Sequence, residues 1–392
     1  MQAVLYDLSP ALRLLLIGAL LASGPLLMVY LRTRRGSPLG GVHALTLVTL
    51  FLTFDLVLFG AFTRLTDSGL GCPDWPGCYG SASPIGAGNH IDVAQQAMPT
   101  GPVTPGKAWV EMVHRYLAMG VGGLIMVLAG LAWLQRKPRD GRTAGAVVSP
   151  WWATLTAVWV CIQGAFGALT VTMKLFPAIV TLHLLGGYGL LALLTVQSTL
   201  LALQHKPQAA LAVPPRLRTW AGLALLLLML QAMSGAWVST NYAVLACSEF
   251  PTCQGSWWPQ MDFAHGLEIW RPLGYLRDGS PISFQGLTAI HFTHRLLAGV
   301  TLMALAGLAY SLLNRPALRH HGRALGALLA LQLATGLSNV VLDWPLLAAV
   351  LHTGGAGALV VVLVRLLVAT HTTSTRTFSA PSGATTSPGL HA

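Results

Sequence analysis

Long apolar segments, separated by polar or charged stretches, recur along the whole chain. Each is roughly 20 residues long, which is the length that an α-helix needs to cross a ~30 Å hydrocarbon core. Because a helix satisfies its own backbone hydrogen bonds in lipid, the pattern predicts an all-α polytopic membrane protein. The predicted spans are 11–31, 41–63, 109–134, 151–172, 177–203, 219–240, 287–312, 323–342 and 345–370.

The spans after the first one read as two copies of one unit. The first copy contains GAFTRLTDSGLGCPDWPGCYG and the second SGAWVSTNYAVLACSEFPTCQG, with two cysteines six residues apart in each. EMVHRYLA and LHLLGGYG then follow in the first copy, and IHFTHRLLAG and LHTGGAG in the second. A repeat of this length governs the fold prediction. We expect two pseudo-symmetric four-helix transmembrane bundles plus one extra N-terminal helix.

The repeat predicts four regions along the chain. Residues 1–40 hold the extra helix and a loop, 41–206 the N-terminal bundle, and 207–371 the C-terminal bundle. The region 372–392 is rich in Ser, Thr and Pro, so we expect a disordered tail. The first apolar segment is longer than a signal peptide requires and has no clear cleavage site, which favours a membrane span.

Composition and charge agree with this class. The chain is 54% hydrophobic and only 9% charged, and its mean hydropathy is +0.63. Most of its 23 Lys and Arg residues lie in one set of loops, so the positive-inside rule predicts a cytoplasmic C-terminus and an outside N-terminus. The long loops 64–108 and 241–286 then face outward. The net charge of +11 does not indicate nucleic-acid binding, because no basic face with interleaved aromatic residues accompanies it.

Each outward loop holds one cysteine pair. In an oxidising compartment the six-residue spacing suits a disulfide, and it also suits a thiol redox couple or a metal pair. Neither loop has a second cysteine pair or a nearby histidine cluster that would complete a zinc site. The sequence therefore favours disulfides that join Cys72 to Cys78 and Cys247 to Cys253.

Four histidines occupy matched places in the two copies: His114 and His183, then His294 and His352. Ionisable groups are costly within a membrane span and usually face a pathway or a cofactor. Imidazole is a common metal ligand, and bundle cores hold haem. We therefore predict two haem-sized sites with two axial ligands each; the alternative is four structural histidines without a ligand. The small residues expected to leave room for a flat macrocycle are Gly120, Gly186, Gly187, Gly299, Gly354 and Gly355.

One asymmetry separates the two copies. Glu111 precedes His114 by three residues and shares its helical face, whereas His291 stands at this place before His294. A carboxylate at membrane depth is costly unless it is paired or functional, and beside a porphyrin it would transfer protons. The alternative is an ion pair with Arg115 or an interfacial group. Because only the first copy carries the acid, we predict that catalysis takes place there.

Basic and polar neighbours of the histidines have two interpretations each. Arg115 and Arg295 directly follow a predicted ligand, and guanidinium groups bind carboxylates such as haem propionates. Extension of both side chains to the membrane interface explains them equally well. His291 is either a hydrogen-bond donor behind the ligands or polar filler.

The motifs in this order closely resemble the heme A synthase family. They are TRLTDSGLGCPDWPGCYG, ExxHR, LHLLGGYG, ACSEFPTCQG, HFTHRL and LHTGGAG, over about residues 41–370. The resemblance implies an oxidoreductase that converts haem O to haem A for cytochrome c oxidase assembly. The C8 methyl group of the porphyrin becomes a formyl group by successive hydroxylations, with water as the oxygen source.

The resemblance also implies a role for each site residue. His114 and His183 would hold the substrate haem O, His294 and His352 would ligate the iron of a prosthetic haem b, and Glu111 would be catalytic. A haem O synthase would hand over the substrate within the lipid bilayer of a bacterial inner membrane. The electron acceptor and the existence of a homo-oligomer are left open.

Two other function classes fit parts of the pattern. A transmembrane b-type cytochrome with bis-histidine haem would pass electrons between quinol and a partner without chemistry on the porphyrin. Two features favour the synthase: Glu111 stands at the repeat position that His291 occupies in the second copy, and the outer loops carry cysteine pairs. A transporter would show broken helices and charges at the midplane, and the ionisable groups lie in the outer third instead.

Overall fold

The computed structural model describes residues 9–36, 40–135, 148–205 and 213–377. In these ranges nine helices are long and apolar enough to cross a membrane, so the predicted all-α polytopic fold is confirmed. The spans are α1 (Ser9–Arg34), α2 (Gly41–Leu65), α4 (Pro105–Leu134), α5 (Pro150–Thr172), α6 (Pro177–His205), α7 (Pro215–Thr240), α9 (Phe284–Leu313), α10 (Arg319–Val341) and α11 (Leu346–Thr377). Shorter elements are α3 (Gly88–Ala97), η2 (Ala243–Ala246), α8 (Phe263–Gly266) and η3 (Pro316–Leu318).

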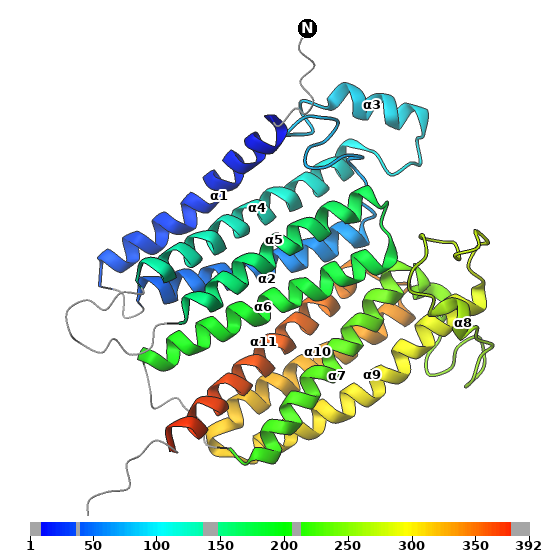
Figure 1. Cartoon of the computed structure of the whole chain (residues 1–392). Coiled ribbons are helices and arrows are strands. Elements are labelled where there is room, and N and C mark those ends of the chain that lie inside the picture. Colours follow the sequence, from blue (N-terminus) through cyan, green and yellow to red (C-terminus); the bar gives the residue numbers. More distant parts are fainter. Residues whose placement is uncertain (1–8, 37–39, 136–147, 206–212, 378–392) are drawn as a thin grey trace, which may run out of the picture.

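The spans contact one another in two rings of four helices (Figure 1). One ring runs α2, α4, α5, α6 and back to α2, and the other runs α7, α9, α10, α11 and back to α7. The rings adjoin through α6 and α11, α2 and α11, and α6 and α7. Across this boundary the buried Tyr188 donates its hydroxyl proton to the carbonyl oxygen of Thr353 at 2.8 Å. The same contact order in each ring suits the predicted pair of bundles, whose pseudo-symmetry stays a prediction.

Helix starts in both rings follow local sequence. α4, α5 and α7 carry proline in the first turn, where the missing N–H would have no helical partner. α4 begins after Thr104, whose Oγ1 accepts a hydrogen bond from the backbone N–H of Lys107 at 3.3 Å. α9 begins after Ser283, whose Oγ accepts from Gly286 at 3.1 Å. These caps define the starts of two helices that carry matched histidines.

The extra N-terminal helix α1 lies outside the rings and packs on α4 and α2. Its buried residues include Leu14, Gly18 and Ala22, whose four-residue spacing places them on one face. Gly18 allows close packing, because an added Cβ would lie 2.6 Å from the Cβ of Met119. Leu20, on another face, is 73% exposed, which suits a helix surrounded by lipid.

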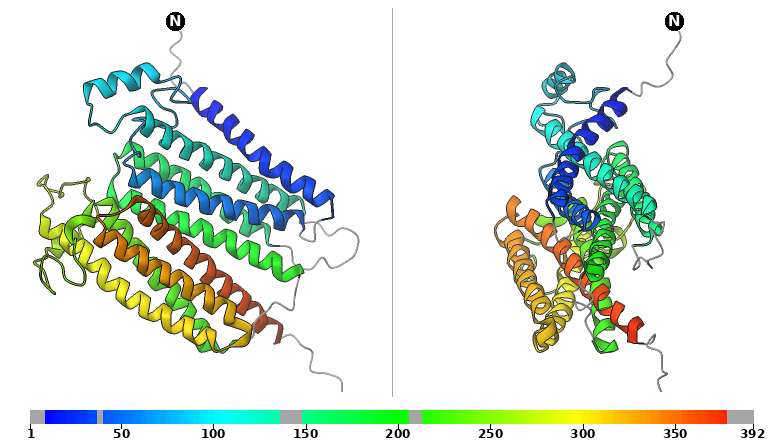
Figure 2. Two further views of the ribbon diagram at one scale, coloured as in Figure 1. Left: turned by 180° about the vertical axis from the view of Figure 1, so that it is seen from behind. Right: turned by 90° about the vertical axis from the view of Figure 1, so that its left-hand side faces the viewer.

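Both long connections gather at one end of the bundle, here called the loop end (Figure 2). They contain α3 in one case, and η2 and α8 in the other. At the C-terminus α11 continues to Thr377, past residue 372 where the predicted tail begins, so the first residues of that segment are helical. Residues 378–392 of the predicted tail lie outside the described part of the chain.

Candidate functional site

The four matched histidines lie on four different helices, near the loop end of each. His114 is in α4 and His183 in α6, and His294 is in α9 and His352 in α11. Counted from the helix starts at ~1.5 Å per residue, they lie roughly 9–15 Å along their helices. Within each ring the two histidines lie on diagonally opposite helices, α4 and α6 in the first ring and α9 and α11 in the second. The structure therefore brings together the two pairs that the repeat predicts.

Each imidazole lies against a glycine of the preceding helix in its own ring. A Cβ added to Gly60 in α2 would lie 3.0 Å from Cε1 of His114. At Gly235 in α7 the distance to Cε1 of His294 would be 2.8 Å. The other pairs are Gly167 with His183, at 3.5 Å, and Gly336 with His352, at 3.3 Å. A larger residue at Gly60 or Gly235 would displace the ring.

These are not the glycines that the sequence prediction selected. Of that set, Gly120 faces α1, where an added Cβ would lie 3.3 Å from Cβ of Leu21, and Gly299 has open space around it. An added Cβ on Gly186 or Gly355 would collide with a glutamine side chain instead of a histidine. The contacts to the histidines form between helices, and the expected room for a macrocycle beside the six glycines stays a prediction. A signal was present: Gly60 and Gly235 each precede the first cysteine of their loop by twelve residues.

The two helix rings differ in the hydrogen bonds made by the imidazole nitrogens of their histidines. Ser234 Oγ lies 2.9 Å from Nδ1 of His294, and Thr335 Oγ1 lies 2.9 Å from Nδ1 of His352. In the first ring, Nδ1 of His114 and Nδ1 of His183 are buried and have no hydrogen-bond partner. The sequence analysis missed both hydroxyl residues, because each lies far along the chain from the histidine that it contacts.

Glu111 is buried, with 4% of its surface exposed, and both carboxylate oxygens are bonded. Oε1 accepts a hydrogen bond from Nη2 of Arg115 at 2.5 Å, and Oε2 accepts one from the backbone N–H of Cys72 at 2.7 Å. Arg115 also donates to the carbonyl oxygens of Asp74, at 3.0 Å, and Gly77. The ion pair between Glu111 and Arg115, one of the two alternatives from the sequence, is therefore present.

The corresponding residues of the second ring bind their loop in a similar way. Nδ1 of His291 lies 3.1 Å from the carbonyl oxygen of Ala243, and Nε of Arg295 lies 3.4 Å from Nε2 of His291. Arg295 also donates to the carbonyl oxygens of Cys247, at 2.6 Å, and Thr252, at 3.1 Å. Both arginines thus hold backbone carbonyls of the cysteine loops, and their binding to propionates stays a prediction.

Both cysteine pairs are disulfides in the structure, Cys72 with Cys78 and Cys247 with Cys253. All four cysteines are completely buried, and each loop packs on the histidine-bearing helix that follows it. Cys161, which lies in α5, is free and exposed.

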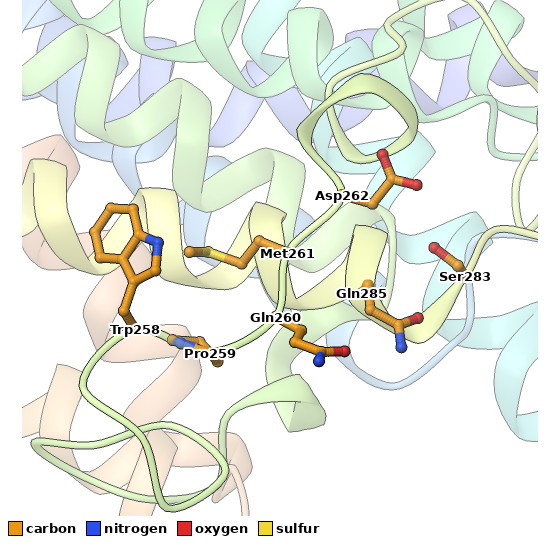
Figure 3. Close-up of a pocket in the computed structure, with 7 residues that line it drawn as sticks. All are labelled: Trp258, Pro259, Gln260, Met261, Asp262, Ser283 and Gln285. Carbon is orange, nitrogen blue, oxygen red and sulfur yellow. The ribbon is translucent and has the colours of Figure 1, made fainter.

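A surface pocket of about 610 Å³ lies at the loop end of the second ring (Figure 3). None of the matched histidines lines it, so it is distinct from the predicted haem sites. Hydrogen bonds from the backbone N–H and the imidazole of His265 hold the pKa of the Asp262 carboxyl in its wall below the usual value. Its lining consists of Trp258, Pro259, Gln260, Met261, Asp262, Ser283 and Gln285.

An arginine at the loop end joins the two rings. Nη2 of Arg64, at the end of α2, donates to the carbonyl oxygen of Ser239 in α7 at 2.6 Å. Its guanidinium lies 4.2 Å from the ring centre of Tyr242, whose hydroxyl donates to Oδ1 of Asp67 at 2.6 Å. Burial raises the pKa of the Tyr242 phenol. These three contacts hold the start of the first long loop against the second ring.

Comparison with known proteins agrees with this arrangement. The sequence pattern of the COX15-CtaA family, described as cytochrome oxidase assembly protein, matches residues 43–364. A protein of Shewanella oneidensis named Heme A synthase is 38% identical over 322 residues, which cover 81% of this chain and 93% of that protein. Proteins of the same name from Symbiobacterium thermophilum and Halalkalibacterium halodurans are 30% identical over 328 residues and 28% identical over 313 residues. These matches cover 80% and 76% of this chain, and 90% and 86% of those proteins. The matched segment contains all four matched histidines and nearly all of both helix rings, and the chain belongs to the COX15-CtaA family of cytochrome oxidase assembly proteins.

Proposed function

We propose that this protein is a heme A synthase, an oxidoreductase that converts the C8 methyl group of haem O to a formyl group. The product, haem A, serves cytochrome c oxidase assembly. One observation carries the proposal: a chain of this family places one pair of histidines inside each ring of membrane helices.

The residues around each histidine pair fit a haem. Histidine imidazoles would hold the iron of a haem, and each ring supplies two imidazoles from different helices. Glycines against the imidazole edges let neighbouring helices approach without displacing the rings. In the proposal, His114 and His183 hold the substrate haem O, and His294 and His352 hold a prosthetic haem b. A bound haem b supplies one-electron redox chemistry.

Glu111 is the proposed proton-handling group. Conversion of a methyl to a formyl group adds an oxygen atom and removes protons and electrons, so a proton acceptor beside the substrate assists the reaction. Glu111 lies one helical turn from His114, and the second ring has His291 at the same place. Arg115 holds the carboxylate at Oε1, and the Cys72 backbone holds it at Oε2, which fixes its position before the substrate binds.

The proposed setting is a bacterial inner membrane with the loop end outside. Arginines cluster at the opposite end, which the positive-inside rule assigns to the cytoplasm. They are Arg32, Arg34, Arg35, Arg216, Arg218, Arg315, Arg319 and Arg323. Haem O would arrive through the bilayer from a haem O synthase, and the electrons removed from the methyl group would leave to an acceptor.

Pigment extraction tests the proposal. Membranes that contain a haem O synthase should gain haem A when the unmodified protein is co-expressed, and should gain much less with the Glu111→Gln variant. A b-type cytochrome would give a bound-haem spectrum in the same membranes and no haem A. That outcome would refute the synthase proposal.

A further inference from the structure

Ser234 and Phe59 occupy the same place in the repeat, thirteen residues before the first cysteine of their loops. Ser234 Oγ lies 2.9 Å from Nδ1 of His294. Phe59 instead stacks on the imidazole of His114, with ring centres 6.2 Å apart and planes 8° apart. A phenyl ring has no hydrogen-bonding atom, and Nδ1 of His114 is buried without a partner.

At the other histidine of each ring, phenylalanine again stands in the first ring where the second ring has a hydroxyl residue. Thr335 and Phe166 each lie three residues after the matched glutamine of their helix. Thr335 Oγ1 lies 2.9 Å from Nδ1 of His352. Phe166 offers no hydrogen bond, and Nδ1 of His183 is buried without a partner. Both histidines of the second ring thus have a hydroxyl at Nδ1, and both histidines of the first ring have phenylalanine at the matched position.

The two hydroxyls act as acceptors toward the imidazoles. Ser234 Oγ donates its proton to the carbonyl oxygen of Gln231 at 2.9 Å, and Thr335 Oγ1 donates to that of Leu331 at 2.7 Å. A hydroxyl has one proton, so each oxygen accepts from the Nδ1–H of its histidine. With Nδ1 protonated, the free lone pair is on Nε2, which would be the atom that holds the haem iron.

The Gln231 side chain adds to this arrangement at His294. Its Nε2 lies 3.0 Å from Nδ1, and its Oε1 is buried without a partner. Exchange of the two amide ends, which have nearly the same shape, would turn Oε1 toward the Nδ1–H, at the cost of the hydrogen bond that Nε2 donates to the carbonyl oxygen of His294 at 3.3 Å. The first ring has Leu56 at this place, sixteen residues before Cys72, as Gln231 is before Cys247.

We propose that Ser234 and Thr335 are positioning residues that make the second ring a permanent haem site, and that Phe59 and Phe166 make the first ring an exchange site. This inference rests on the proposed function, in which the first ring takes up haem O and releases haem A. An acceptor at Nδ1 fixes the imidazole plane and raises its basicity, and loss of such a partner lowers metal affinity roughly 10–100-fold. A site that turns over its haem needs the weaker ligation.

Transfer of haem from the purified full-length protein to excess apomyoglobin tests the second ring. Ser234→Ala and Thr335→Val remove the acceptor with little change in size, and a His114→Ala background restricts the measurement to the second ring. We expect haem loss roughly 10–100-fold faster. The midpoint potential of the haem should rise, because a less basic imidazole stabilises ferric iron less. The control is Ser338→Ala, whose hydroxyl bonds only the carbonyl oxygen of Ala334 in the same helix.

A conservative variant and a reciprocal pair complete the test. Thr335→Ser keeps the hydroxyl and should behave like the unmodified protein. In a His294→Ala background, Phe59→Ser should slow haem loss from the first ring relative to Phe59→Ala, which opens the same space without a hydroxyl. Unchanged haem loss and potential in Ser234→Ala and Thr335→Val would overturn the inference while haem A formation still supported the proposed function. If the unmodified protein formed no haem A but the variants changed haem retention as expected, only the proposed function would be refuted.

Discussion

The Oε2 atom of Glu111 accepts a hydrogen bond from the backbone N–H of Cys72 across 2.7 Å. This bond ties helix α4, three residues before His114, to the loop closed by the first disulfide. In the second ring, His291 makes the corresponding contact to the carbonyl oxygen of Ala243. The first ring therefore has a carboxylate acceptor at a position where the second has an imidazole donor.

Glu111→Gln should lower haem A formation by roughly 10²–10⁴-fold, the usual contribution of a general acid or base. Gln keeps an acceptor for the Cys72 N–H and cannot take up a proton. Haem in the second ring should remain, and quantified haem extraction measures both. Glu249→Gln is the matched control, because Glu249 accepts from the Gly255 N–H within its own exposed loop. Near-normal haem A from Glu111→Gln would reduce Glu111 to an anchor for the loop.

Arg115→Met should destabilise the protein more than Arg295→Met. Removal of Arg115 leaves the buried Glu111 carboxylate without its ion pair, and loss of one partner from a buried pair costs about 3–5 kcal/mol. Removal of Arg295 leaves only the uncharged His291 and backbone carbonyls. Thermal unfolding in detergent compares the two variants. The double variant Glu111→Gln/Arg115→Met should recover part of the loss; equal effects of both single variants would contradict this account.

His294→Ala or His352→Ala should each abolish the low-spin bis-histidine spectrum of the second ring, because each removes one of its two axial ligands. Optical spectra of the purified protein, reduced and oxidised, measure the effect. His265→Ala is the control, since His265 lies exposed in the second long loop. An unchanged spectrum in both ligand variants would refute the assignment.

Gly235→Ala should disturb the second-ring spectrum, because the new Cβ would lie 2.8 Å from Cε1 of His294. Gly222→Ala, thirteen residues from Gly235 in the same helix α7, provides the control, since its Cβ would meet nothing within 4 Å. Alanine is the better helix former by about 1 kcal/mol, so without the contact both variants should be neutral or stabilising. Identical spectra for both variants would exclude the close contact.

Reduction of either disulfide should cost ~2–3 kcal/mol of stability, because each closes a short loop in the unfolded chain. Mass spectrometry under non-reducing conditions should find Cys72 linked to Cys78 and Cys247 linked to Cys253, and thermal unfolding with and without reductant gives the cost. Free thiols that react at once with an outside-only alkylating reagent would instead support a redox role for the pairs.

Much of the site was predictable because the signals lie in local stretches of chain. Helix length against bilayer thickness predicts the spans, and equal spacing in the two copies predicts which histidines correspond. The ion pair between Glu111 and Arg115 follows from a four-residue separation on one helix, so the sequence contained it as an alternative. The contacts between glycines and histidines could not be predicted in this way: Gly120 is close to His114 in the chain, but its face of the helix packs on α1.

The sequence by itself determined the membrane class, the repeat and the four histidines, since these depend on apolar length and spacing along the chain. Only the tertiary structure decided that Gly60 and Gly235 lie under imidazole rings, that Ser234 and Thr335 bond Nδ1, and that Glu111 bonds Cys72. The physical reason is that these contacts join separate elements. Rotation of each helix about its axis is set by packing across the ring, and spacing within one helix carries no record of it.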